Sequence, residues 1–255
     1  MARTIRIGLL LFVLLAVAQG AWIARGRTTD WKEPLRVVIY PINGDRSAAA
    51  DRYIQGLPRD GFEPLAVYMR AQARNYGLPL RSPVEVYLAP RVDGLPPEPP
   101  RDAKPLAIVA WSLQLRFWAW RNDGYSGPKA HARIFVKYFA PASNLSLAHS
   151  VGLREGLIGV VNAFASDDMT GGNHVVIAHE LLHTFGATDK YDPATNQPLY
   201  PDGYAEPNAR PRLPQTLAEI MAGRIPLSPT QAETPRGLDE TVIGAATARE
   251  ISWSK

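Results

Sequence analysis

The sequence contains no cysteine among its 255 residues. This absence excludes disulfide bonds, lipid attachment through an N-terminal cysteine and any zinc site built on thiolates. It does not argue against export, because a chain of this length can be stable on its hydrophobic core alone.

A strong charge of one sign is also absent. Lys and Arg total 28 against 24 Asp and Glu, so the formal net charge is only +4, and the basic residues are scattered along the chain. We therefore predict no nucleic-acid partner. The chain is 46% hydrophobic and 20% charged and shows no internal repeat, which is typical of one globular domain with appendages.

The longest apolar run lies at the N-terminus. Arginines precede the apolar residues 7–24 and follow them, which is typical of an export signal. The small residues Ala16 and Ala18 suit cleavage by a signal peptidase, whereas Trp22 and the basic residues after it equally suit an uncleaved membrane span. We predict that residues 1–27 are a signal peptide or an N-terminal membrane anchor. Residues 28–255 would then lie outside the cytoplasm, anchored to the membrane or secreted/periplasmic.

The strongest functional signal is the run at residues 179–189, which reads His-Glu-Leu-Leu-His-Thr-Phe-Gly-Ala-Thr-Asp. The apolar residues 173–178 before it predict a buried helix. Side chains four apart on a helix lie about 5–6 Å from each other on one face, so His179 and His183 can aim at one point. Glu180 is close enough to that point to touch a metal-bound water without being a ligand.

Two neutral imidazoles suit Zn²⁺, and a catalytic zinc needs a third protein ligand and an open position. Gly186 allows the chain to leave the helix through a left-handed turn, after which Asp189 arrives as the predicted third ligand. Asp192 competes for this role but would need a wider loop, and a turn residue before Pro193 is its better interpretation. Glu219 also competes as a distant ligand, but a Glu219 ligand would leave the left-handed turn at Gly186 without a role.

The pattern His-Glu-x-x-His-x-x-Gly-x-x-Asp, followed downstream by Glu-Ile-Met-Ala-Gly at residues 219–223, resembles the metzincin clan of zinc metalloproteases. It resembles the variant with Asp in place of the third His, which leaves the site less positive. The resemblance covers about residues 156–225 and specifies no family within the clan. It implies a site with zinc ligands His179, His183 and Asp189, general base Glu180 and, under the metal, Met221.

An α/β fold of the zincin-like α+β type follows from the resemblance and from the order of the elements. It has a twisted mixed sheet, a backing helix, the active-site helix and a loop-rich C-terminal subdomain, with an upper part at about 28–186 and a lower part at about 187–255. Local patterns predict strands at 35–40, 84–88, 106–120, 132–139 and 156–165. They predict helices at 48–57, 63–76 and 238–253, and a proline-rich loop at 90–105.

The predicted function is that of a zinc-dependent endopeptidase acting on a peptide or protein substrate, with Glu180 activating the water. Tyr191 and Tyr204 are candidate donors to the oxyanion. The other histidines are interpreted as structural: His131, His149 and, as a surface or capping residue, His174. Two alternatives remain open: an exported zinc amidase acting on cell-wall peptide crosslinks, and a non-catalytic, zinc-stabilised peptide-binding protein.

Overall fold

The structure is a computed structural model that describes residues 19, 26, 28, 30–100 and 104–254. The predicted signal peptide or anchor, residues 1–27, therefore lies outside the described residues except at positions 19 and 26. Within the described ranges, no helix combines the length and the hydropathy that crossing a bilayer requires.

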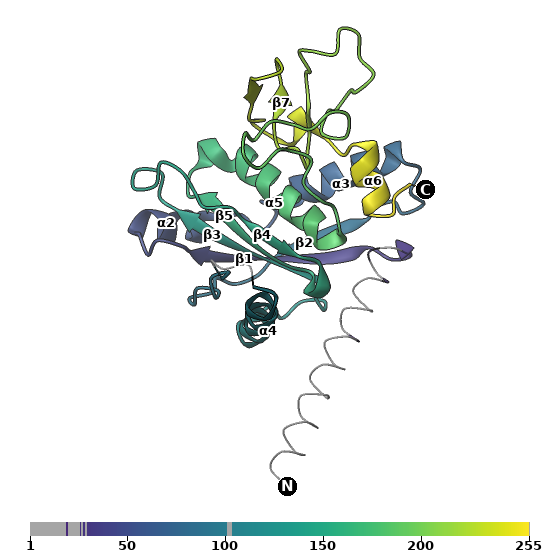
Figure 1. Cartoon of the computed structure of the whole chain (residues 1–255). Coiled ribbons are helices and arrows are strands. Elements are labelled where there is room, and N and C mark those ends of the chain that lie inside the picture. Colours follow the sequence, from purple (N-terminus) through teal and green to yellow (C-terminus); the bar gives the residue numbers. More distant parts are fainter. Residues whose placement is uncertain (1–18, 20–25, 27, 29, 101–103, 255) are drawn as a thin grey trace.

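A five-stranded mixed sheet forms the centre of the fold, in the order β2-β1-β3-β5-β4 (Figure 1). Strands β2, β1, β3 and β5 are parallel, whereas β4 at the edge runs antiparallel to β5. The strands span β1 Leu35–Asn43, β2 Val84–Leu88, β3 Ala132–Phe139, β4 Val151–Leu153 and β5 Ile158–Phe164. This mixed sheet with its helices confirms the predicted mixed α/β class.

Helices cover both faces of the sheet. They are α2 (Ala48–Gly56), α3 (Glu63–Asn75), α4 (Pro105–Arg121), α5 (Thr170–Phe185) and α6 (Ala245–Glu250). Val37 and Ile39 of β1 belong to the core shared with α2, α3 and α5. Val38 and Tyr40, which alternate with them, belong to a second core shared with α4. Helix α4 thus lies on the face opposite to α5 (Figure 1), as the period of two along a strand requires.

The prediction of a strand at residues 106–120 is wrong, because this segment lies within α4. Its β-branched and aromatic residues favour strands. However, Trp111, Leu115 and Ala119 are buried at helical spacing, so they can pack on the sheet together only as a helix. Pro105 at the first turn also suits a helix start.

The chain beyond Gly186 is rich in loops, as predicted. It contains two small sheets, β6 (Ala218–Glu219) with β9 (Thr241–Val242) and β7 (Ile225–Pro226) with β8 (Ala232–Glu233). The predicted helix at 238–253 is only partly correct. A 3-10 turn at Leu238–Glu240 and strand β9 occupy its first half, and α6 begins after Gly244.

The remaining predicted strands and helices are confirmed. The predicted strands at 35–40, 84–88, 132–139 and 156–165 correspond to β1, β2, β3 and β5, and the predicted helices at 48–57 and 63–76 correspond to α2 and α3. The described part of the proline-rich segment 90–105 has no helix or strand before α4 begins, apart from an isolated bridge between Val92 and Ile42.

Candidate metal centre

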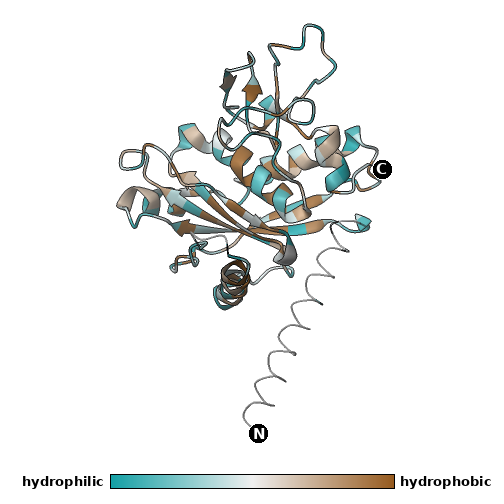
Figure 2. Cartoon of the chain, viewed as in Figure 1, coloured by the Kyte–Doolittle hydropathy of each residue, from teal (hydrophilic) through white to brown (hydrophobic). Residues whose placement is uncertain are grey.

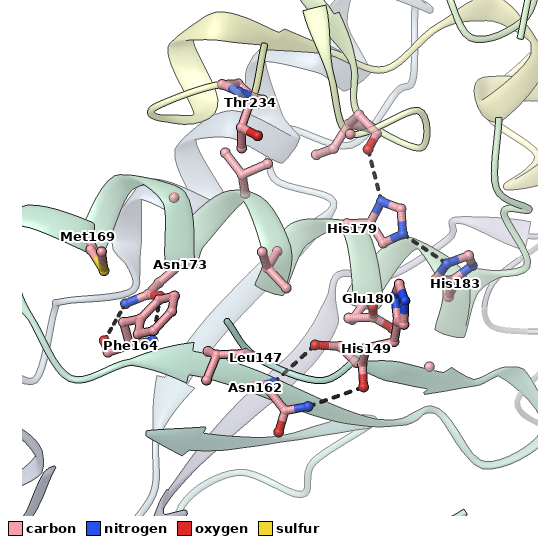
Figure 3. Close-up of a pocket in the computed structure, with 18 of the residues that line it drawn as sticks. Leu147, His149, Asn162, Phe164, Met169, Asn173, His179, Glu180, His183 and Thr234 are labelled. Atoms are coloured by element: carbon pink, nitrogen blue, oxygen red, sulfur yellow. Dashed lines mark hydrogen bonds between the residues drawn. The ribbon is translucent and has the colours of Figure 1, made fainter. Parts of the chain in front are cut away.

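Helix α5 carries the histidine pair and is fixed to the sheet at its start. The Asn173 amide accepts a hydrogen bond from Phe164 N (3.0 Å) and donates one to Phe164 O (2.8 Å), which ties α5 to β5 (Figure 3). The helix ends at Gly186, whose φ of 109° is in the left-handed region. A Cβ at Gly186 would also lie 2.6 Å from Cζ of Arg154. The predicted glycine turn is therefore confirmed.

The two imidazoles point their Nε2 atoms at each other, 3.0 Å apart (Figure 3). Nδ1 of His179 lies 2.9 Å from Ile220 O, and Nδ1 of His183 lies 2.9 Å from Ala187 O. A carbonyl oxygen only accepts hydrogen bonds, so each Nδ1 carries a proton, and a ring without a second proton presents its Nε2 lone pair to the other ring. Two lone pairs at this distance repel each other unless a cation or a proton lies between them.

Glu180 completes a group that could hold a metal ion. The ligand atoms of His179, Glu180 and His183 all lie within 4.8 Å of one another. The Glu180 side chain is buried, and no described residue donates a hydrogen bond to its Oε2. Burial raises the pKa of this carboxyl, and the two imidazoles oppose the shift. A buried oxygen without a partner is costly, so Oε2 is suited to a partner from outside the chain.

The Asp189 carboxylate lies against the same two rings. Its Oδ1 is 3.2 Å from Nε2 of His179 and 3.1 Å from Nε2 of His183. Burial raises the pKa of Asp189, but the contacts with the two histidines outweigh it and hold the pKa well below its usual value. For His183, burial lowers the pKa and the contact with Asp189 raises it, with a net rise. Both shifts show that these residues together attract positive charge.

Both competitors for the third-ligand position make contacts elsewhere. The side chain of Asp192 accepts a hydrogen bond from Ala194 N, the contact of a turn residue. Glu219 is fully buried; its Oε2 accepts hydrogen bonds from N–H groups of its own turn, and its Oε1 accepts from Gly244 N and from the Thr247 hydroxyl of α6. Met221 is buried directly after Ile220, whose carbonyl contacts His179. The turn that contains Met221 therefore contacts His179 through its backbone.

A cavity of about 920 Å³ opens over the cluster (Figure 3). Helix α5, strand β4 and the loops at 147–150 and 234–236 line it. Its apolar side chains include Leu147, Val151, Phe164, Met169, Val175 and Val176. A volume of this size accommodates a drug-sized ligand or several residues of a peptide.

The structure separates the two candidate tyrosines. Tyr191 lines the cavity over the cluster. Burial raises its pKa, and the charges of Asp189 and Glu180 add to the shift, so the hydroxyl keeps its proton and can donate it. Tyr204 instead lines a separate cavity beside α6, so the structure does not bring it to the site.

His149 is the site residue that the sequence interpretation missed. It lines the cavity and lies beside Glu180 (Figure 3), and its charge acts to lower the pKa of Glu180. Asn162 of β5 holds its backbone, donating to Ala148 O (3.0 Å) and His149 O (3.1 Å). No spacing in the sequence connects His149 with the motif, because only the pairing of β4 with β5 brings it near α5.

The other two histidines lie outside this cavity. The two ring nitrogens of His131 contact Arg36. Arg36 N donates to Nδ1 (3.2 Å), and Arg36 Nη2 lies 2.7 Å from Nε2. His174 was expected at the surface or as a cap, but its side chain is buried edge-on to Phe62. Helix α5 is covered on that side by the loop before α3, so the expectation of a surface position is wrong.

No model of a known protein family matches the sequence, and no curated protein sequence matches it.

Proposed function

We propose that this chain is a zinc-dependent endopeptidase of the zincin-like fold, with a metzincin-like site. One observation carries the proposal. Nε2 of His179, Nε2 of His183 and Oδ1 of Asp189 form a triangle with edges of 3.0, 3.2 and 3.1 Å, beside the unpartnered oxygen of Glu180.

The triangle fits zinc. A tetrahedral Zn²⁺ with nitrogen and oxygen ligands at about 2.0–2.1 Å needs ligand atoms about 3.3–3.4 Å apart. The observed edges of 3.0 to 3.2 Å reach this spacing through outward shifts of a few tenths of an ångström. Two imidazoles and one carboxylate form a donor set typical of catalytic zinc, whereas Mg²⁺ and Ca²⁺ prefer oxygen ligands alone.

The protein groups around the triangle divide the work of hydrolysis. A bound zinc ion would act as a Lewis acid and lower the pKa of a coordinated water to about 7. Glu180 accepts a proton from the attacking water and passes it to the leaving amine. Tyr191 donates a hydrogen bond to the oxyanion that forms at the scissile carbonyl. The carbonyls of Ile220 and Ala187 hold the two imidazoles in the orientation that ligation requires.

The edge of the sheet supports a peptide as substrate. Strand β4 pairs with β5 on one side only among the described residues. It also lies very close to α5, because a Cβ on Gly152 would be 2.6 Å from Cβ of His183. An extended peptide can add to such an edge through main-chain hydrogen bonds, which would place its backbone over the cluster.

The arrangement also favours catalysis over a purely structural metal. A metal that only ties the cleft together does not need a buried carboxylate without a partner beside it. Glu180 has that environment, and its cost in stability is explained if the residue handles a proton during the reaction. The export signal predicted for residues 1–27 supports a location of the site outside the cytoplasm.

The test compares three variants of the full chain for zinc content and for cleavage of casein and a peptide library. Glu180→Gln should retain zinc and lose about 10²–10⁴-fold in hydrolysis. Asp189→Ala should lose zinc and activity together. Asp192→Ala is the matched control and should retain both. Activity retained in Glu180→Gln, or zinc retained in Asp189→Ala, contradicts the proposal, and release of muropeptides without peptide cleavage assigns the site to an amidase.

A further inference from the structure

Among the described residues, helix α4 buries one side and leaves the other exposed. Trp111, Leu115 and Ala119 are buried toward the sheet, and the Trp118 ring meets Phe135 of β3 edge-on at 4.8 Å. Among the described elements, α4 is the helix that lies beneath the sheet, away from α3, α5 and α6 (Figure 1). Its ribbon is coloured mostly as hydrophobic in Figure 2. A surface helix that only covered a core would have a polar outer side.

The outer side of α4 instead presents an apolar stripe. Its members recur every three or four residues and therefore share one face of the helix. We call them the α4 stripe: Leu106 (85% exposed), Val109 (56%), Leu113 (36%), Phe117 (60%) and Trp120 (70%). The Phe117 and Trp120 rings lie 5.8 Å apart. A contiguous exposed apolar patch of this kind marks a surface that contacts a partner or a membrane.

We propose that the α4 stripe docks onto the interface of an anionic lipid bilayer, with the helix lying flat on the membrane. The positive charges at the ends of α4 favour an anionic lipid surface as the partner. The segment from Lys104 to Arg121 contains no acidic residue, and both of these terminal cations are exposed. Trp and Arg at one end of an apolar helical face suit the headgroup region, where indole rings concentrate and cations meet anionic lipids.

The N-terminal segment also supports a membrane as the partner of the α4 stripe. Residues 7–24 form the apolar run of the predicted signal or anchor, and the domain begins only a few residues later, at β1. An uncleaved anchor would keep α4 within reach of the bilayer and raise its effective concentration there. A second copy of the chain is less suited to cover the stripe, because α4 offers no acidic residue to pair with the cations of the other copy.

Docking through α4 also orients the candidate metal centre. Helix α5 lies on the opposite face of the sheet from α4 (Figure 1). The cavity over the histidine pair would therefore face away from the membrane, toward substrates in the surrounding solution. This inference concerns a surface remote from the metal site and stands or falls separately from the proposed peptidase activity.

The absence of cysteine allows a direct test with single labels. Val109→Cys places one thiol in the α4 stripe, and Val67→Cys places one at an equally accessible position (50% exposed) on α3. Each full-length variant is labelled with the environment-sensitive dye NBD and reconstituted into phosphatidylethanolamine vesicles with or without phosphatidylglycerol. Because both variants carry the same N-terminal segment, a difference between them reports on α4 alone.

At position 109 we expect a blue shift, a several-fold gain in NBD emission and quenching by lipids with brominated acyl chains, all stronger with phosphatidylglycerol. At position 67 we expect water-like emission throughout. Adding Phe117→Glu to the Val109→Cys variant should abolish the response, and its unchanged circular dichroism spectrum would show that the fold is intact. Water-like emission at position 109 in vesicles overturns the proposal. A blue shift of the NBD emission that depends on protein density and not on lipid charge also overturns the proposal. It would assign the stripe to contact with a second copy of the chain.

Discussion

Replacing Glu219 with Gln should destabilise the turn that orients His179. Glu219 is completely buried in β6. Its carboxylate accepts four hydrogen bonds, from Met221 N (2.7 Å), Ala222 N (3.1 Å), Gly244 N (3.0 Å) and Thr247 Oγ1 (2.7 Å). Three of the four donors are backbone N–H groups, which favour the ionised carboxylate, whereas burial, the larger effect, raises the pKa of this carboxyl.

The cost of Glu219→Gln follows from where the new NH₂ group can lie. If the NH₂ group takes the position of Oε2, it faces two backbone N–H groups. If it takes the position of Oε1, it faces one backbone N–H group, that of Gly244, because the Thr247 hydroxyl can rotate and accept a hydrogen bond. The second orientation leaves one buried N–H without an acceptor and replaces charge-assisted bonds with neutral ones. Together these losses should lower the free energy of unfolding by about 2–4 kcal/mol.

The same substitution should weaken metal binding without touching a proposed ligand. Ile220 O, which contacts His179 Nδ1 at 2.9 Å, lies between Glu219 and Met221 in the turn that the carboxylate holds. Loss of such an outer contact typically reduces metal affinity about 10–100-fold.

Urea denaturation of the full chain in the presence of a chelator would measure the change in stability, and competition with a zinc indicator would measure affinity. Glu233→Gln is the matched control, because Glu233 is exposed in β8 and loses the same charge. If Glu219→Gln unfolds at the same urea concentration as Glu233→Gln and binds zinc equally well, the carboxylate does not organise the turn.

Two further predictions concern other parts of the sheet. A Cβ on Gly152 would lie 2.6 and 2.7 Å from atoms of α5, so Gly152→Ala should move β4 and reduce zinc affinity and peptidase activity together. Gly56→Ala, with open space around its Cβ, should change neither. Burial raises the pKa of Asp123, but hydrogen bonds from Tyr40 and Arg133 outweigh it and lower the pKa below its unfolded value. The carboxylate therefore stabilises the fold above about pH 4 and loses this effect as the pH falls through the folded-state pKa. Acid unfolding of Asp123→Asn should be less steep in this range, and an identical acid limb would refute the assignment.

The histidine pair and its turn could be predicted because every step is local. His179 and His183 share a face through helix periodicity, and Gly186 is needed for the left-handed residue that ends α5. These short-range constraints also bring Asp189 back to the rings. A local motif in which each residue has a separate geometric purpose therefore specifies most of the cluster.

The parts that were missed depend on contacts between distant segments. His149 reaches the cavity only because β4 pairs antiparallel with β5. Glu219 looked like a possible ligand, and its actual partners at Gly244 and Thr247 lie in a segment that sequence spacing does not connect to it. Tyr204 is close to the motif in sequence and still lies at a different cavity.

Helix α4 shows why composition alone misassigned a long segment. Strands β1 and β3 are buried on both faces, so each face needs a cover. Residues Trp111, Leu115 and Ala119 supply that cover on the side of Val38 and Tyr40, and three inward-facing side chains at helical spacing are sufficient for it. The outer face of α4 was free to be polar, yet it carries apolar side chains. The apolar residues on both sides of α4 are what made the segment resemble a strand in the sequence. Their number is explained if the helix has two apolar contacts, one with the sheet and one with a surface outside the chain.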